Sequence, residues 1–298
     1  MKILVIGGSG YMGSELVRAL SDVTVWDNLR FGNNLPKGVK VVEEDIRDHS
    51  YALPLYIKEA DVVIHLAATS KEPTSLYNTQ YCIDTNYCAT KDIVRYCKET
   101  GTKLIYASSC SVYFSYDIIK NPGLSKEDDV LNPISPYSIT KYASEQCIRE
   151  ELDDYVILRP GTHYGVSPRM RLDLVVNAMM SSALTQGTIM YKKGIYRQLV
   201  DIQTMVQAYI QSFDLQGTYN VFDFNVSLKD LAERVQQTAY AEIEGVDTEV
   251  ERNYRASREK MDKDFDIERR PFGEALKEIR EWVETHDTTK DKYYNARQ

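Results

Sequence analysis

A glycine-rich loop between a strand-like and a helix-like segment constrains the fold of this chain most. The apolar, β-branched segment Lys2–Ile6 leads directly into Gly7-Gly8-Ser9-Gly10-Tyr11-Met12-Gly13, and apolar residues at helical spacing continue over Tyr11–Leu20. In a dinucleotide-binding fold, one glycine makes the tight turn, a second admits the diphosphate, and a third lets helix and strand pack closely. The free N–H groups of the first helical turn favour the same anion. The loop therefore predicts a nucleotide site, and the alternative is a turn that serves the fold alone.

The rest of the first half alternates strand-like and helix-like segments. Buried apolar strands that alternate with helices predict a Rossmann-type doubly wound parallel sheet of the α/β class. After Arg159 the alternation weakens, and we expect a smaller α+β C-terminal substrate-binding domain. We expect a dinucleotide-binding domain over 1–165, joined by a strand near 198–203, and the substrate domain over 166–298. The expected strands are Val23–Trp26, Val39–Glu43, Asp61–Leu66, Lys103–Ala107 and Tyr155–Leu158, and the expected helices include Thr85–Lys98, Tyr137–Leu152 and Phe272–Thr285.

Charge and composition exclude several classes of function. The 36 basic and 44 acidic residues give a net charge of −8, which repels nucleic acid and anionic membrane surfaces. No segment has the roughly 20 consecutive apolar residues that cross a bilayer, and the N-terminal residues read as a strand, so we expect a cytoplasmic protein. The five cysteines contain no Cys-x-x-Cys pair, and the four histidines lack metal-ligand spacing. We therefore expect reduced thiols and no metal site.

Acidic residues follow the second and third expected strands. Asp27 stands 20 residues after Gly7, where a carboxylate accepts hydrogen bonds from both hydroxyls of the adenosine ribose. The same carboxylate repels a 2′-phosphate, so NAD is favoured over NADP, a preference that the nearby Arg30 would soften. Its neighbour Asn28 belongs to the same expected site. Asp45-Ile46 follows the third strand and is expected to reach the adenine edge.

The pattern Tyr-x-x-x-Lys places a phenol and an ammonium group one helical turn apart. A nearby ammonium lowers the pKa of a phenol and lets it exchange protons near neutral pH. The pattern occurs three times among 22 tyrosines, so position must choose between the copies. Tyr137 opens an expected helix about 28 residues after Ser108-Ser109, which end an expected strand. Because ligands of open α/β sheets bind at that edge, Tyr137 and Lys141 are the candidates, in preference to the pairs that start at Tyr87 and Tyr116.

These motifs occur together in an order that resembles one known family. The set consists of Gly7, Gly10 and Gly13, Asp27, His65-Leu66-Ala67-Ala68, Asn86, Ser108 to Tyr113, Tyr137 to Lys141, and Arg159 to Gly165. It is similar to the extended short-chain dehydrogenases/reductases of the NAD-dependent sugar-nucleotide epimerase/dehydratase family. The resemblance is clear over about residues 1–205 and faint from Arg252 to Lys260.

The resemblance implies roles for individual residues. Tyr137 would be the acid/base, Lys141 would hold the nicotinamide ribose, and Ser109 would hydrogen-bond the reacting sugar oxygen. Asn86 and the backbone of Leu66, Ala67 and Ala68 would line the cofactor channel, with Tyr11 and Met12 at the glycine loop. The substrate, a nucleoside-diphosphate sugar, would be held by Ser111, Thr162, Asn177, Arg197 and Arg252, with Arg169 and Arg171 as further candidates for its diphosphate.

Departures from the family pattern bear on the reaction. Dehydratases carry an Asp-Glu pair after the catalytic hydroxyl residue and decarboxylases a Glu, whereas this chain has Cys110 and Ser111. The resemblance therefore favours an epimerase that acts at C4 of the sugar through a 4-keto intermediate. Thr162 replaces the Asn of many epimerases, and Asp201 and Thr204 replace a frequent His and Asp, which leaves the sugar open.

Two other functions stay open at this point. One is an NAD(P)H-dependent reductase, or a bifunctional epimerase/reductase, acting on a 4-keto sugar nucleotide. The other is a non-catalytic nucleotide-binding sensor on the same fold. The resemblance also implies a homodimer, formed by pairing of the two long helices around a two-fold axis. The last dozen residues are polar, and we expect them to be loosely held.

Overall fold

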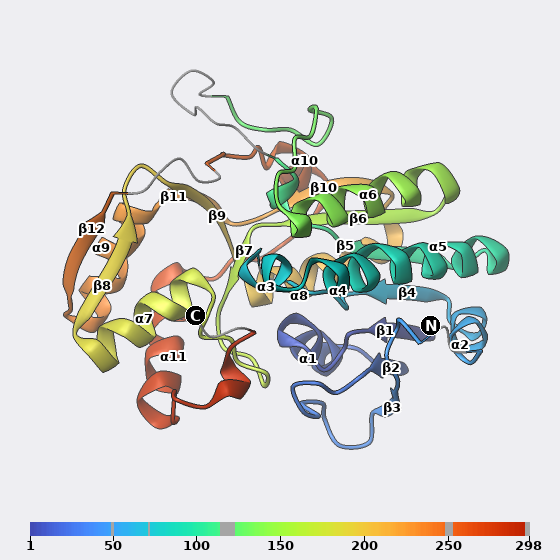
Figure 1. The fold of residues 1–298 in the computed structure, drawn as a ribbon, viewed down its shortest axis with the longest axis horizontal. Helices are drawn as coiled ribbons and strands as arrows, with labels where there is room; N and C mark the ends of the chain where they lie inside the picture. Colours follow the sequence, from blue (N-terminus) through green and yellow to red (C-terminus); the bar gives the residue numbers. More distant parts are fainter. Residues whose placement is uncertain (49–50, 71, 114–122, 248–252, 296–298) are drawn as a thin grey trace.

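The structure is a computed structural model that describes residues 1–48, 51–70, 72–113, 123–247 and 253–295 (Figure 1). Within these residues, seven strands form a central sheet in the order β10-β6-β5-β4-β1-β2-β3, and every neighbouring pair is parallel. This is the expected doubly wound fold, and the order reverses between β1 and β4. The strands are β1 (Ile3–Ile6), β2 (Val23–Asp27), β3 (Lys40–Glu43), β4 (Val62–His65), β5 (Lys103–Ala107), β6 (Tyr155–Pro160) and β10 (Gly217–Val221).

Both faces of the sheet are buried, because successive side chains of a strand point to opposite faces. In β1, Ile3 and Val5 pack into one apolar cluster and Leu4 and Ile6 into another. The first cluster includes side chains of α1 and α8, and the second includes side chains of α2, α5 and α6. The helices that flank the sheet are α1 (Tyr11–Ala19), α2 (Leu53–Glu59), α3 (Glu72–Tyr77), α4 (Thr79–Ile83), α5 (Ala89–Thr100), α6 (Pro136–Glu151), α8 (Ile202–Gln211) and α10 (Glu259–Asp264).

A smaller unit lies beside one end of the sheet, at the left of Figure 1. It contains a three-stranded sheet in the order β11-β9-β7 and a parallel pair, β12 and β8. Its apolar core is distinct from the two clusters on the large sheet. Its elements are β7 (Thr162–Tyr164), β8 (Thr188–Lys192), β9 (Tyr196–Asp201), β11 (Phe224–Ser227), β12 (Glu242–Val246), α7 (Val175–Gln186), α9 (Leu228–Ala239) and α11 (Phe272–Thr285).

The structure corrects the expected division of the chain. The strand expected near 198–203 to join the large sheet is β9, which instead pairs with β7 and β11 in the small sheet. The strand that completes the large sheet is β10, paired with β6. Helices α8 and α10 also pack on the large sheet, so no single cut at residue 165 separates the two units. The reason is that the chain returns to the large sheet after forming β9.

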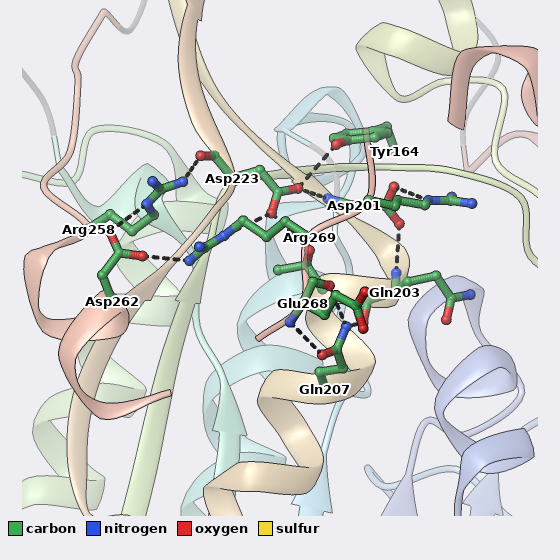
Figure 2. Close-up of polar contacts among 11 residues, drawn as sticks. Tyr164, Asp201, Gln203, Gln207, Asp223, Arg258, Asp262, Glu268 and Arg269 are labelled. Atoms are coloured by element: carbon green, nitrogen blue, oxygen red, sulfur yellow. Dashed lines mark hydrogen bonds and ion pairs between the residues drawn. The ribbon is translucent and has the colours of Figure 1, made fainter. Parts of the chain in front are cut away.

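A cluster of charged side chains fastens the turn between β10 and β11 (Figure 2). Asp223 in this turn accepts hydrogen bonds from the Tyr164 hydroxyl at 3.1 Å and the Asp201 backbone N–H at 2.6 Å. Arg258 donates to the Asp223 carbonyl, and the Arg269 Nε lies 3.7 Å from its carboxylate. Asp201 itself caps α8 by accepting from the Gln203 N–H. The cluster therefore joins the two units at a buried point.

The C-terminal segment is held more firmly than its polar composition predicts. Tyr293 is buried, its carbonyl accepts from Leu172 N–H at 2.9 Å, and its ring meets that of Trp282 edge-on. Beyond it, the Asn295 side chain reaches Ser70 and Arg169. The expectation of a loose tail is therefore wrong over 291–295, because one aromatic anchor in the small core orders its polar neighbours.

Helix α6 is seated on the sheet by a buried ion pair. Glu145 of α6 and Arg159 of β6 are both fully buried, with Nε–Oε1 and Nη2–Oε2 distances of 2.9 and 2.6 Å. Arg159 also donates to the hydroxyl of Tyr113, and Ser108 bonds the Glu145 carboxylate. Arg149 also lies 3.2 Å from Glu145, but among the described residues Glu145 is the carboxylate that pairs with the buried Arg159, so the pair fixes the position of the helix that carries Tyr137.

Replacing Glu145 by alanine is expected to destabilise the protein by about 3–5 kcal/mol, because it leaves the buried Arg159 charge uncompensated. The matched control is Glu151→Ala on the same helix, whose solvent-exposed pair with Lys98 is expected to leave the stability nearly unchanged. Urea unfolding followed by circular dichroism measures both changes. Equal losses in the two variants would contradict this account of α6.

Candidate active site

One cavity of about 490 Å³ lies at the carboxyl edge of the large sheet. Its lining includes the glycine loop and Asp27 at one end and Ser109, Tyr137 and Lys141 at the other. The predicted nucleotide and chemical ends therefore share one space. The edge where parallel strands end and their order reverses is where such folds bind ligands.

The glycine loop has the shape that a diphosphate requires. Gly7 has a φ of +85°, and a Cβ there would lie 2.5 Å from the backbone N of Ala67. A Cβ on Gly13 would lie 2.5 Å from the Gly7 carbonyl. Gly10 caps α1 without a side-chain hydrogen bond, and the first turn holds no acidic residue. The N–H groups of this turn are thus available to an anion, and the residues present fit a dinucleotide.

Asp27 lies at the end of β2 with both carboxylate oxygens held by the backbone. Oδ2 accepts from Ser9 N–H and Oδ1 from Leu29 N–H, each at 2.8 Å. Burial raises the pKa of the Asp27 carboxyl, and these two hydrogen bonds oppose the rise. The loop and the carboxylate are therefore one rigid unit, with the acid lining the cavity.

The second acidic position of the nucleotide end is also fixed. Asn28 Nδ2 donates to Asp45 at 2.9 Å, and Arg47 donates to both Asp45 oxygens. Burial alone would raise the pKa of Asp45, but the hydrogen bonds from Arg47 and Asn28 outweigh it and lower the pKa to about 2. Asp45 therefore stays ionised, and Ile46 lines the cavity next to it.

The loop after β4 lines the cavity, whereas Asn86 supports this loop from outside the cavity. Leu66, Ala67 and Ala68 line the cavity, whereas Asn86 is buried and does not. Asn86 lies in a short π-helical turn (Asp84–Cys88), accepts from Thr69 N–H at 2.8 Å and donates to Thr140 on α6 at 3.2 Å. The structure thus places Asn86 as a tie between this loop and α6.

The chemical end combines the end of β5 with the first turn of α6. Ser109 follows β5, caps a short 3₁₀ turn (Cys110–Val112), and accepts from Ser111 N–H at 3.1 Å. Tyr137 lies in the first turn of α6, which Ser135 and Ser138 begin with a capping box. Both Ser109 and Tyr137 line the cavity.

Lys141 is buried one turn further along α6. Its Nζ donates to the Ala107 carbonyl at 2.6 Å and lies 4.6 Å from the centre of the Tyr106 ring. Burial lowers the pKa of Lys141 to about 7, and the nearby Glu145 and Cys82 side chains partly oppose this decrease. The neighbouring His65 bonds Thr90, and burial lowers its pKa to about 3, so it is neutral and unsuited to acid–base work.

The residues expected to hold the substrate are only partly brought together. Ser111, Thr162 and Arg197 line the cavity. Asn177 is buried away from the lining and bonds the backbone of Gly165 and Arg171. Arg252 lies outside the described residues.

Sequence reasoning missed several lining residues. Phe31, Thr69, Ser70, Asp173, Tyr254 and Asn295 all line the cavity. No sequence pattern marks Asn295, which meets Ser70 across 225 positions of the chain. The part of the chain that the structure describes contains no cluster of metal-ligating side chains and no helix long and apolar enough to cross a bilayer.

The parallel sheet, the glycine loop and the Ser–Tyr–Lys set at one edge define an enzyme of the extended short-chain dehydrogenase/reductase type. The sequence profile of the NAD dependent epimerase/dehydratase family matches residues 3–223, so the chain belongs to this family. Its cofactor is NAD, as the family description states.

Comparisons with known proteins agree with this family. The chain is 34% identical over 174 residues to the "Putative UDP-glucose 4-epimerase" of Methanocaldococcus jannaschii, a match that spans 55% of this chain and 56% of that relative. It resembles the UDP-N-acetylglucosamine 4-epimerase of Methanobrevibacter ruminantium M1, with a TM-score of 0.81, 26% identity, and 95% and 97% of the two chains covered. It also resembles DesIV, a dTDP-glucose 4,6-dehydratase of Streptomyces venezuelae, with a TM-score of 0.83, 21% identity, and 96% and 98% covered.

The burial of Lys141 predicts how the stability of the protein depends on pH. Its pKa is about 7 in the folded protein and near 10.5 in the unfolded chain, so the unfolded state binds more protons between these values. Burial of the protonated Lys141 therefore lowers the free energy of unfolding by its full amount below pH 7. This loss of stability vanishes as the pH rises toward 10.5. Lys141→Met is expected to raise the melting temperature relative to the parent near pH 6.5, with the gain shrinking toward pH 10. Differential scanning calorimetry without nucleotide measures this difference, and a difference independent of pH would contradict the burial of Lys141.

Proposed function

We propose that this protein is an NAD-dependent epimerase that inverts C4 of a nucleoside-diphosphate sugar through a 4-keto sugar. The distribution of carboxylates carries the proposal. Among the described lining residues, the acids are Asp27, Glu44, Asp45 and Asp173. The first three belong to the nucleotide end, and Asp173 is bonded to Arg171 through both oxygens. No carboxylate of the described lining lies on the strand end that carries Ser109 or on the helix that carries Tyr137.

This distribution separates two reactions of the family. Elimination of water across C5 and C6 needs a group that removes the C5 proton and one that protonates the departing hydroxyl. Inversion at C4 needs one proton to leave the 4-hydroxyl and later return to the same oxygen. Cys110 and Ser111 follow Ser109 without a carboxyl group, and the Cys110 thiol is buried against the Arg159 carbonyl. The site therefore favours inversion.

The side chains divide the work of this reaction. Tyr137 removes the proton from the sugar 4-hydroxyl and later gives it back. Ser109 accepts from Ser111 N–H, which leaves its own hydroxyl hydrogen to donate to the sugar oxygen. Lys141, when protonated, favours the phenolate by its charge, one helical turn away. When bound, NAD would supply the hydride acceptor for C4 and, in its reduced form, the donor that restores hydrogen to C4 of the 4-keto sugar from the other face.

The smaller unit is proposed to supply the pocket for the nucleoside diphosphate. Thr162 of β7 and Arg197 of β9 lie in the same cavity as Tyr137, which supports this assignment. The relative from M. jannaschii is named for UDP-glucose, so uridine diphosphate sugars are the first substrates to test. Roles for Asn177 and Arg252 and the homodimer stay predictions.

Tyr137→Phe is expected to lower the rate of epimer interconversion by about 10²–10⁴-fold, because it removes the proton-transfer group. NAD binding should be unchanged, since the glycine loop is untouched. The measurement is NMR and mass analysis of uridine, thymidine, guanosine and cytidine diphosphate sugars after incubation. The matched control is Tyr87→Phe, which alters the same Tyr-x-x-x-Lys pattern outside the cavity lining and should keep full activity.

Other products would overturn the proposal. Loss of water from the sugar would indicate a dehydratase. Net consumption of NADH with a 4-keto sugar nucleotide would indicate a reductase. Equal rates for the Tyr137→Phe variant and the parent would remove Tyr137 from the chemistry.

A further inference from the structure

The cavity contains a buried guanidinium group whose donors are not all used. Arg169 is 3% exposed and lines the cavity, and its Nη2 donates to Asn295 Oδ1 at 2.7 Å. Among the described residues, its Nε and Nη1 find no hydrogen-bond partner although both atoms are buried. Buried charged donors without partners are costly. A group of this kind that faces a cavity points to an anionic ligand.

The charge of the neighbouring Arg171, in contrast, is paired with a carboxylate. Its Nε and Nη2 donate to the two oxygens of Asp173 at 2.9 and 3.1 Å, and its Nη1 donates to Ser70. Asp173 is thus engaged by Arg171. Burial first, and then the charge of Arg171, lower the pKa of Arg169 to about 10, so Arg169 still carries its charge at neutral pH. The cavity therefore holds a positive charge without a bonded carboxylate among the described residues.

Hydrogen bonds join the segment just before Arg169 to the start of α1. The Tyr11 hydroxyl donates to the Gly165 carbonyl at 2.7 Å, and the Ser167 hydroxyl donates to the Tyr11 carbonyl at 2.7 Å. Ser14 and Ser167 also share a hydrogen bond of 3.1 Å. The segment that carries Arg169 is therefore tied to the first turn of α1, whose N–H groups form the predicted diphosphate site.

Phe31 sets the orientation of the guanidinium plane. The Arg169 Cζ lies 4.1 Å from the centre of the Phe31 ring, and the next residue, Gly32, accepts from the Ser9 hydroxyl of the glycine loop. Phe31 covers one face of the group, and Asn295 holds Nη2. The buried N–H groups of Nε and Nη1 remain, and because they point to different sides of the guanidinium plane, each can donate to a separate oxygen of an anionic ligand.

We propose that Arg169 binds the diphosphate of NAD, together with the first turn of α1, and that Asn295 orients the guanidinium for this contact. The diphosphate of the nucleotide sugar has the same chemistry, but the contacts to Phe31, Tyr11 and Ser167 place Arg169 on the cofactor side. The inference depends on the NAD cofactor and not on the proposed epimerisation, so either can fail without the other.

Calorimetric titration of the full-length protein, freed of copurified nucleotide, tests the inference. The probes are NAD, ADP-ribose and adenosine, and UDP is titrated into NAD-saturated protein. Arg169→Gln is expected to lower the affinity for NAD and ADP-ribose about ten- to a hundredfold. The affinities for adenosine and UDP should change less than about twofold. Arg169→Lys should recover part of the affinity, because it keeps the charge and loses the planar fork. Asn295→Ala should weaken NAD less than Arg169→Gln does.

Arg18→Gln is the matched control, because it removes an exposed arginine of α1 whose side chain is 57% exposed. It should leave all four affinities unchanged. Without nucleotide, the melting temperature of Arg169→Gln should equal or exceed that of the parent, since an unpaired buried charge is lost. Unchanged NAD affinity, an equal loss for adenosine, or a loss confined to UDP would overturn the inference.

Discussion

The structure depends on a seam of buried polar contacts that seats helix α6 on the sheet. The buried face of this helix is mostly polar, and Ser144 and Lys141 donate to backbone carbonyls of Asn86 and Ala107 while Glu145 pairs with Arg159. Apolar packing tolerates small shifts, whereas paired buried groups lose much of their energy when they move apart. The seam therefore fixes the helix, and with it Tyr137 in its first turn, relative to the strand end that carries Ser109.

Local patterns in the sequence predicted the parts of the fold that depend on local physics. The glycine loop, the buried strand β1 and the amphipathic helix α11 lie where spacing and composition placed them. The Tyr-x-x-x-Lys pattern occurs three times, and the expected strand end before Tyr137 favours that copy. Tyr137 does line the cavity. Pairings between distant segments were not visible, so β9 was assigned to the wrong sheet. The contact of Asn295 with Arg169 was missed for the same reason, because a polar tail gives no sign of what it meets.

The cavity also shows how an acidic protein can bind an anionic ligand. The chain carries a net charge of −8, yet Arg169, Arg171 and Arg197 line this cavity. Asp27 is bonded to backbone N–H groups, and Asp45 and Asp173 are each paired with an arginine. Among the described lining residues, no carboxylate lies on the strand end and helix that carry Ser109 and Tyr137. Local placement of charge, and not the net charge, thus determines which ligands the site accepts.

The most direct test of this account is the fate of a deuterium label at C4 of a nucleoside-diphosphate sugar that the protein converts. Inversion at a single carbon predicts that both epimers carry the label at C4, with none at C6 and none lost to water. NMR of the purified products measures its position. Deuterium at C6, or its replacement by solvent hydrogen, would contradict the claim that the site carries out oxidation and reduction at one carbon.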